Sequence, residues 1–265
     1  MRNNFAKIIL FFVFELLLFS VSSAFPIDAT KDSVSVKKDT TKSKIKLNIG
    51  SDIMSRFIWR GSDYGNSPSI EPTLSLSISN FEVGCWSSIA TNSYYKEIDM
   101  YAKYTYKSFS LLFTDYYVPL LNNTPAAPDI RYFNYNDKKT AHYFEGSLIY
   151  KGSDKFPLWL LGGVFFYGND KRWGCDNQKD SLCKTYFSSY IEAGYTFTIK
   201  ENSADLFVGF TPFAGAYGNT MGVINTGITG YRKIKISNDF VLPVKASLIF
   251  NPQKSDIFFA LGFTL

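Results

Sequence analysis

Residues 47–61, LNIGSDIMSRFIWRG, alternate between apolar and polar side chains with a period of two. The apolar parity carries Leu47, Ile49, Ile53, Phe57 and Trp59, and the other parity carries Asp52, Arg56 and Arg60. A period of two is typical of a β-strand, because successive side chains point to opposite faces. The stretch is long for a soluble protein, whose strands usually span about five or six residues. The pattern predicts a wall strand with an apolar outer face and a polar inner face.

The same alternation recurs along the rest of the chain and predicts about twelve strands, an even number as in single-chain bacterial barrels. We expect them at residues 47–61, 70–78, 81–89, 97–106, 109–118, 142–150, 158–167, 186–199, 205–216, 222–232, 240–250 and 255–265.

The connections between these strands are sorted by length. The fifth (119–140) and the seventh (168–184) are the longest, whereas the second, fourth, sixth, eighth and tenth are all short. Short turns on one side and long loops on the other are the usual asymmetry of an outer-membrane barrel. We therefore predict an all-β fold, a transmembrane antiparallel up-and-down β-barrel over residues 45–265. The runner-up fold is a soluble, secreted β-sandwich.

Composition excludes several other classes. The mean hydropathy of −0.06 is too low for a bundle of membrane helices, each of which needs about twenty apolar residues in a row. Aromatic residues make up 18% of the chain, which is high for a soluble protein. The net charge of +5 comes from lysines scattered over turns and the N-terminal part, so no basic groove for nucleic acid is indicated.

The N-terminal residues predict export. Residues 1–24 combine a basic start at Arg2 and Lys7, an apolar core and small residues before Phe25, which is typical of a secretory signal peptide. Residues 25–44 are rich in Thr, Ser, Lys and Asp without apolar periodicity, and we expect a disordered periplasmic tail. The compartment would be the outer membrane of a Gram-negative-type bacterium.

The C-terminal residues FFALGFTL alternate apolar side chains up to Leu265. This pattern is typical of the closing strand of an outer-membrane barrel, which the barrel-assembly machinery would recognise. A barrel is favoured over an open sheet because backbone groups in lipid find no water, so every edge must pair. Outer-membrane lipid is the other expected partner.

Several stretches resemble the TorF-type porin family of outer-membrane proteins, over essentially residues 47–265. The resemblance is most specific at Arg60-Gly61, Pro72, Gly84 with Trp86, and Glu97 with Asp99. It rests on SRFIWRG, SPSIEPTLSLS, FEVGCWSS, KEIDMYAKY, TDYYVP, HYFEGSLIY, YIEAGY and ISNDFVLPVKASLIFNP. The family implies a barrel with a transport role, without a defined substrate.

Catalysis has little support in the sequence. His142, the single histidine, shares the outward parity of Phe144 and Leu148, and we expect a histidine at the barrel rim. No GxSxG, HExxH or P-loop motif occurs, and no cofactor or metal site is expected. Cys175 and Cys183 lie in one loop and predict a disulfide, since the compartment is oxidising.

The inward parity collects charges of both signs, our candidate lumen-lining residues. They are Asp52, Arg56, Arg60, Glu71, Glu82, Glu97, Asp99, Lys103, Glu145, Glu192 and Lys245. We expect Arg56 and Arg60 to neutralise acids such as Glu71, Glu82, Glu97 or Asp99 rather than to hold a substrate. Phe57 and Trp59 would form an aromatic belt at the membrane surface. Cys85 would be a free thiol.

Three functions remain open at this point. The first is a porin or narrow channel for small solutes, with a mild cation preference because acids outnumber bases inside. The second is a plugged barrel whose long loops bind a partner or protect the cell. The third is a barrel-embedded hydrolase, which the position of His142 disfavours.

Overall fold

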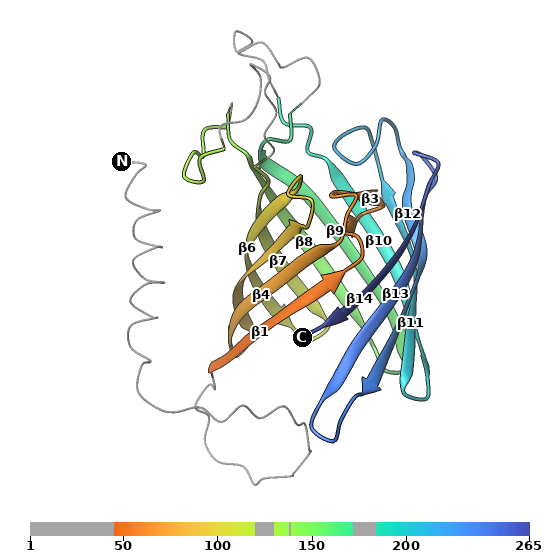
Figure 1. The fold of residues 1–265 in the computed structure, drawn as a ribbon. Helices are drawn as coiled ribbons and strands as arrows, with labels where there is room; N and C mark the ends of the chain where they lie inside the picture. Colours follow the sequence, from red (N-terminus) through yellow and green to blue (C-terminus); the bar gives the residue numbers. More distant parts are fainter. Residues whose placement is uncertain (1–44, 120–129, 138, 172–183) are drawn as a thin grey trace, which may run out of the picture. The chain divides into compact units, whose positions relative to one another are not determined.

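The fold is a closed antiparallel barrel of twelve strands, seen in a computed structural model that describes residues 45–119, 130–137, 139–171 and 184–265 (Figure 1). Each strand pairs with its neighbour in the chain, and β1 closes on β14. The barrel strands are β1 (Ile45–Met54), β4 (Ser69–Ile78), β5 (Phe81–Ala90), β6 (Lys96–Tyr106), β7 (Phe109–Tyr117), β8 (His142–Ser153), β9 (Phe156–Gly168), β10 (Ser189–Ile199), β11 (Asn202–Thr211), β12 (Gly222–Lys235), β13 (Val241–Asn251) and β14 (Asp256–Thr264).

The predicted antiparallel β-barrel of twelve strands is thus confirmed, but the opening stretch is corrected. Residues 47–61 are not one wall strand, because β1 ends at Met54. The chain then leaves the wall and forms a separate two-stranded sheet from β2 (Ile58–Trp59) and β3 (Ser62–Asp63). Residues 55–68, which we call the inner hairpin, connect β1 to β4.

The barrel turns its apolar parity outward. Ile49, Leu148 and Phe259 are 76%, 56% and 61% exposed, and large apolar side chains on nearly every barrel strand share this position. The inward parity is mostly polar or charged instead: Ser75, Glu97 and Asp99 are buried inside, together with a few apolar side chains such as Ile224. This arrangement is the inverse of a soluble sandwich, whose apolar faces pack against each other.

Closure occurs where the C-terminal strand meets the first strand. β1 pairs with β14 over three residues, Asp52 with Thr264, Ile53 with Phe263 and Met54 with Gly262. Backbone hydrogen bonds between Ser51 and Leu265 extend the pairing on one side. The prediction of a closing C-terminal strand is therefore confirmed.

The connections follow the predicted alternation. On one end of the barrel, tight turns between β4 and β5, β6 and β7, and β10 and β11 place Ser79, Lys107 and Lys200 at φ values of 55°, 54° and 57°. A left-handed residue in such a turn matches the twist of the two strands that it joins. The other end carries the inner hairpin and the long fifth and seventh connections, and we call it the long-loop end.

Some predictions fall outside the described residues. These are the signal peptide (1–24), the tail (25–44) and the disulfide between Cys175 and Cys183. Cys85 is a free thiol, half-buried on β5. In the described part of the chain, no helix is long and apolar enough to cross a membrane.

Candidate functional site

The inner hairpin folds into the barrel rather than forming an outer loop. Its turn residues, Arg60 and Gly61, have φ values of 49° and 75°, so two left-handed residues join β2 to β3 as in a type I′ turn. Gly61 is required here, because a Cβ atom would lie 1.9 Å from the carbonyl oxygen of Ile224 on β12. Asn251 fastens the turn from β13 by donating to the Gly61 carbonyl at 2.8 Å.

Arg60 carries the contact between the hairpin and the far wall. Its two terminal nitrogens donate to the Glu145 carboxylate of β8, at 2.5 and 2.8 Å. The side chains of Arg60 and Glu145 are 8% and 1% exposed, so the pair is screened from water. A two-pronged arginine–carboxylate pair is among the strongest contacts that two side chains make.

Aromatic rings enclose the guanidinium of Arg60. Its central carbon lies 4.4, 4.6 and 5.1 Å from the ring centres of Trp59, Tyr190 and Tyr217, within the range of cation–π attraction. The Tyr217 hydroxyl accepts from Arg60 and donates to Glu145. Burial raises the pKa of Tyr217, so this hydroxyl stays protonated and remains a donor.

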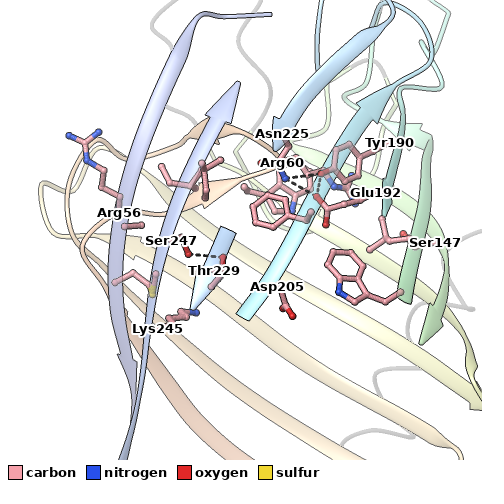
Figure 2. A pocket seen from close by; sticks show the side chains of 18 of the residues that line it. Arg56, Arg60, Ser147, Tyr190, Glu192, Asp205, Asn225, Thr229, Lys245 and Ser247 are labelled. Carbon is pink, nitrogen blue, oxygen red and sulfur yellow. Dashed lines mark hydrogen bonds between the residues drawn. The ribbon is translucent and has the colours of Figure 1, made fainter. Parts of the chain in front are cut away.

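Further polar groups complete this part of the lumen (Figure 2). Asn225 of β12 donates to the Glu192 carboxylate at 2.7 Å and to the Tyr190 hydroxyl at 2.9 Å, and Tyr190 also donates to Glu192. Ser147 donates to Glu145 at 2.5 Å. The described carboxylates on this wall therefore have several donors each. We call this region, centred on Arg60 and Glu145 against β8–β12, the packed half of the lumen.

The packed half also contains an apolar core. Phe165, Tyr190, Tyr217 and Ile224 form it, with Trp59, Tyr116, Tyr143 and Leu161 packed around them. The lumen is thus filled at this level much as the interior of a small soluble domain is filled.

Three cavities surround the hairpin. One of about 450 Å³ lies toward the long-loop end and includes Tyr64, Tyr95 and Asn169. Another of about 440 Å³ lies along β8–β12, and a third of about 390 Å³ along β5–β7. Trp59 and Tyr116 line all three. These two side chains therefore mark the level at which the lumen is narrowed.

The structure places every candidate lumen residue except Glu71 on the lining of a cavity, and several of these charges form ion pairs. Lys245 of β13 contacts Asp52 at 2.6 Å, and Lys103 contacts Glu82 at 2.9 Å. Arg56 pairs with Asp63 within the hairpin at 2.7 Å.

The expected partners of the two arginines are wrong. Arg60 meets Glu145 and Arg56 meets Asp63, and neither meets Glu71, Glu82, Glu97 or Asp99. Sequence alternation could not find these pairs, because it states only which side of the wall a residue faces.

The aromatic belt at Phe57 and Trp59 is also wrong. Both residues follow the end of β1 and lie inside the barrel. The ring centre of Phe57 is 5.2 Å from that of Trp86, and the ring centre of Trp59 is 5.4 Å from that of Tyr116. The period of two continued past Met54 because the hairpin is itself made of β-strands, so the pattern concealed the departure from the wall.

His142 is held in a closed environment on the outward parity. Its Nδ1 lies 2.7 Å from the Asp115 carboxylate and its Nε2 lies 2.6 Å from the Tyr132 carbonyl oxygen. The side chain has no exposed surface, and the rings of Tyr117 and Tyr135 lie against it. Both ring nitrogens already have partners, so the geometry offers no open position for a substrate.

No protein-family model and no curated protein matches the chain. Among the described residues, no group of three or more His, Cys, Asp or Glu side chains is arranged to hold a metal ion.

Proposed function

We propose that this chain is an outer-membrane barrel that passes small solutes through a lumen narrowed by its inner hairpin. The observation that carries the proposal is the position of Trp59, which lines the cavity toward the long-loop end and both cavities beyond it. A solute that crosses the barrel must pass this side chain. The resemblance to TorF-type porins agrees with such a role.

The outer surface supports a membrane location. Exposed large apolar side chains such as Ile49 and Phe259 recur around the barrel, and a water-exposed surface of this kind would be strongly unfavourable. In a bilayer the same side chains face lipid, and the strands form a closed barrel through the short β1–β14 pairing. With the N-terminus in the periplasm, the long-loop end faces outward.

Lumen charge supports passage of cations rather than anions. Glu71, Glu97 and Asp99 make no ion pair with any described Lys or Arg, whereas Lys103 and Lys245 are each paired with a carboxylate. An excess of acidic over basic groups in a narrow pore raises the local concentration of cations to the extent that those acids are ionised.

A second candidate function is a barrel that stays closed until the hairpin moves. The screened Arg60–Glu145 pair and the apolar core around it favour this alternative, because they hold the hairpin against the wall. The plugged state would then serve the surface role of the long loops.

Conductance in planar bilayers tests the proposal and separates the two candidates. We expect the purified full-length protein to produce small single-channel steps, and Trp59→Ala to produce larger ones. Leu148→Ala, on the outward face of β8, is the matched control and should conduct like the native protein.

Other conductance results for the native protein and Trp59→Ala would support the closed barrel or contradict the proposal. Steps in Trp59→Ala together with a silent native protein would support the closed barrel. Silence of both proteins would contradict passage of small solutes, and equal steps in both would contradict a constriction at the hairpin.

A further inference from the structure

The wall of β4–β6 carries a group of carboxylates that the hairpin does not neutralise. Glu71, Glu97 and Asp99 are 6%, 5% and 6% exposed, and all three face inward. Ser69 donates to Glu71 at 2.7 Å, and Tyr95 donates to Glu97 at 2.8 Å. No Lys or Arg of the described chain pairs with any of these three acids. Three buried carboxyl groups therefore share one wall without a cation, and those of Glu97 and Asp99 hydrogen-bond to each other.

Two side-chain oxygen atoms on the inward face of β5 and β6 have no hydrogen-bond partner among the described residues. One is Oδ1 of Asp99 and the other is Oγ of Ser88, whose residue has no exposed surface. Ser88 on β5 lies directly opposite Glu97 on β6, on the same inward face. Leaving a buried polar atom without a partner is costly, and such atoms in a folded protein call for an explanation. Both atoms can accept a hydrogen bond, so a donor would satisfy them.

Aromatic rings border these acids. Phe57, Trp59 and Trp86 line the β5–β7 cavity together with Glu97 and Asp99. The ring centre of Phe57 lies 5.2 Å from that of Trp86 and 6.0 Å from that of Tyr95. The faces of such rings attract cations, including organic cations whose hydration is weak.

The packed half shows how this lumen holds an organic cation. There, the guanidinium of Arg60 is bound by one carboxylate and by three aromatic rings. The β4–β6 wall offers the same two ingredients, carboxylates and rings, and Trp59 borders both places. In the packed half the chain itself supplies a positively charged group with N–H donors, the guanidinium of Arg60. On the β4–β6 wall no Lys or Arg of the described chain takes this place.

From this we infer that Glu97 and Asp99, with Ser88 behind them, bind a small organic cation with N–H donors, a guanidinium or a primary ammonium group, against the rings of Phe57 and Trp86. The inference rests on the proposed function in that this cation would be the solute that the barrel passes. Glu97 lines the cavity on each side of the hairpin, so the bound cation could be received from one cavity and released into the other.

Calorimetric titration of the full-length barrel in detergent tests binding without any need for conduction. At matched ionic strength, we expect methylguanidinium chloride to bind and potassium chloride to bind at least about tenfold more weakly, since potassium ions offer no hydrogen-bond donors. Tetramethylammonium, which binds rings but has no N–H group, should also bind more weakly. Equal affinity for all three cations, or tighter binding of potassium, would overturn the inference.

Variants locate the site. We expect Glu97→Gln with Asp99→Asn to lower the affinity for methylguanidinium by about tenfold or more, because charge-assisted hydrogen bonds are lost. Asp205→Asn removes a lumen carboxylate from β11 on the other wall, bound by Thr196 and Tyr231, and should leave the affinity unchanged. An equal loss in both proteins would show a general effect of lumen charge and would overturn the assignment to this wall.

Reversal potentials separate this inference from the proposed function. Channels that prefer methylguanidinium over potassium, and lose that preference in the Glu97→Gln, Asp99→Asn protein, would support both. Binding by a barrel that never conducts would retain the site and reject passage. Conduction without measurable binding would retain passage and reject the site.

Discussion

The packed half of the lumen and the wall of β4–β6 contain similar residues, but their buried carboxyl groups have different partners. In the packed half, Glu145 is met by Arg60, Ser147 and Tyr217. On the β4–β6 wall, Asp99 keeps one oxygen without a partner among the described residues. A buried carboxylate is tolerated when it is paired and hydrogen-bonded, and it is costly when it is not.

The difference separates stability from function. The packed half uses its charges internally, so it holds the inner hairpin in place and keeps little hydrogen-bonding capacity for a solute: among its described residues, Oδ1 of Asn225, a neutral atom, has no partner. The β4–β6 wall leaves that capacity unused, and we assign the solute to it for this reason. Equivalent substitutions in the two regions should therefore have unequal and even opposite effects.

The largest expected effect comes from breaking the ion pair of the packed half. We expect Arg60→Gln to lower the free energy of unfolding by roughly 3–5 kcal/mol, because it leaves Glu145 charged and buried without its partner. Urea unfolding of the barrel in detergent measures the loss.

Two further proteins control this experiment. Arg60→Gln combined with Glu145→Gln should recover much of the stability, since the uncompensated charge is gone. Asp99→Asn, the equivalent neutralisation on the other wall, should leave stability unchanged or raise it by relieving repulsion from Glu97. Equal losses from Arg60→Gln and Asp99→Asn would contradict the contrast between the two regions.

A change without charge should release the hairpin from the packed half. In Gly61→Ala the new Cβ atom would lie 1.9 Å from the Ile224 carbonyl oxygen, at a residue whose φ is 75°. We expect a loss of about 1–3 kcal/mol in the free energy of unfolding, together with larger single-channel steps.

Gly162→Ala is the matched control for this glycine, because no atom lies within 4 Å of its added Cβ. It should unfold and conduct like the native protein. Native-sized steps in Gly61→Ala would show that the seating of the turn does not set the width of the lumen.

The smallest expected effects on stability come from replacing two buried serines. Ser147 donates to Glu145, whereas Ser88 has no partner among the described residues. We expect Ser147→Ala to cost about 1 kcal/mol of unfolding free energy and Ser88→Ala to be neutral or slightly stabilising in the absence of an organic cation. With methylguanidinium present, the native protein should gain more stability than Ser88→Ala does. A larger loss from Ser88→Ala than from Ser147→Ala would reverse the comparison.

Most of the wall could be predicted from the sequence, but the site could not. Alternation with a period of two indicates strands and faces, and it identified Glu145 and Glu192 as inward residues. It failed at Phe57 and Trp59, because a strand in the inner hairpin has the same period as a strand in the wall. The left-handed turn at Arg60-Gly61 contains a glycine, and this glycine is the one local signal in the sequence that the chain reverses between β2 and β3.

The sequence by itself determined the class of the protein, an antiparallel barrel with an apolar outside and a charged inside, because side-chain alternation is a local property of each strand. Only the tertiary structure decided which charges meet. Arg60 reaches Glu145 across 85 residues of sequence and Tyr217 across 157, and barrel closure and the inward turn of the hairpin bring them together. The same long-range geometry leaves Glu97 and Asp99 without a counter-charge from the described chain, and that separates the wall we assign to the solute from the half that packs the lumen.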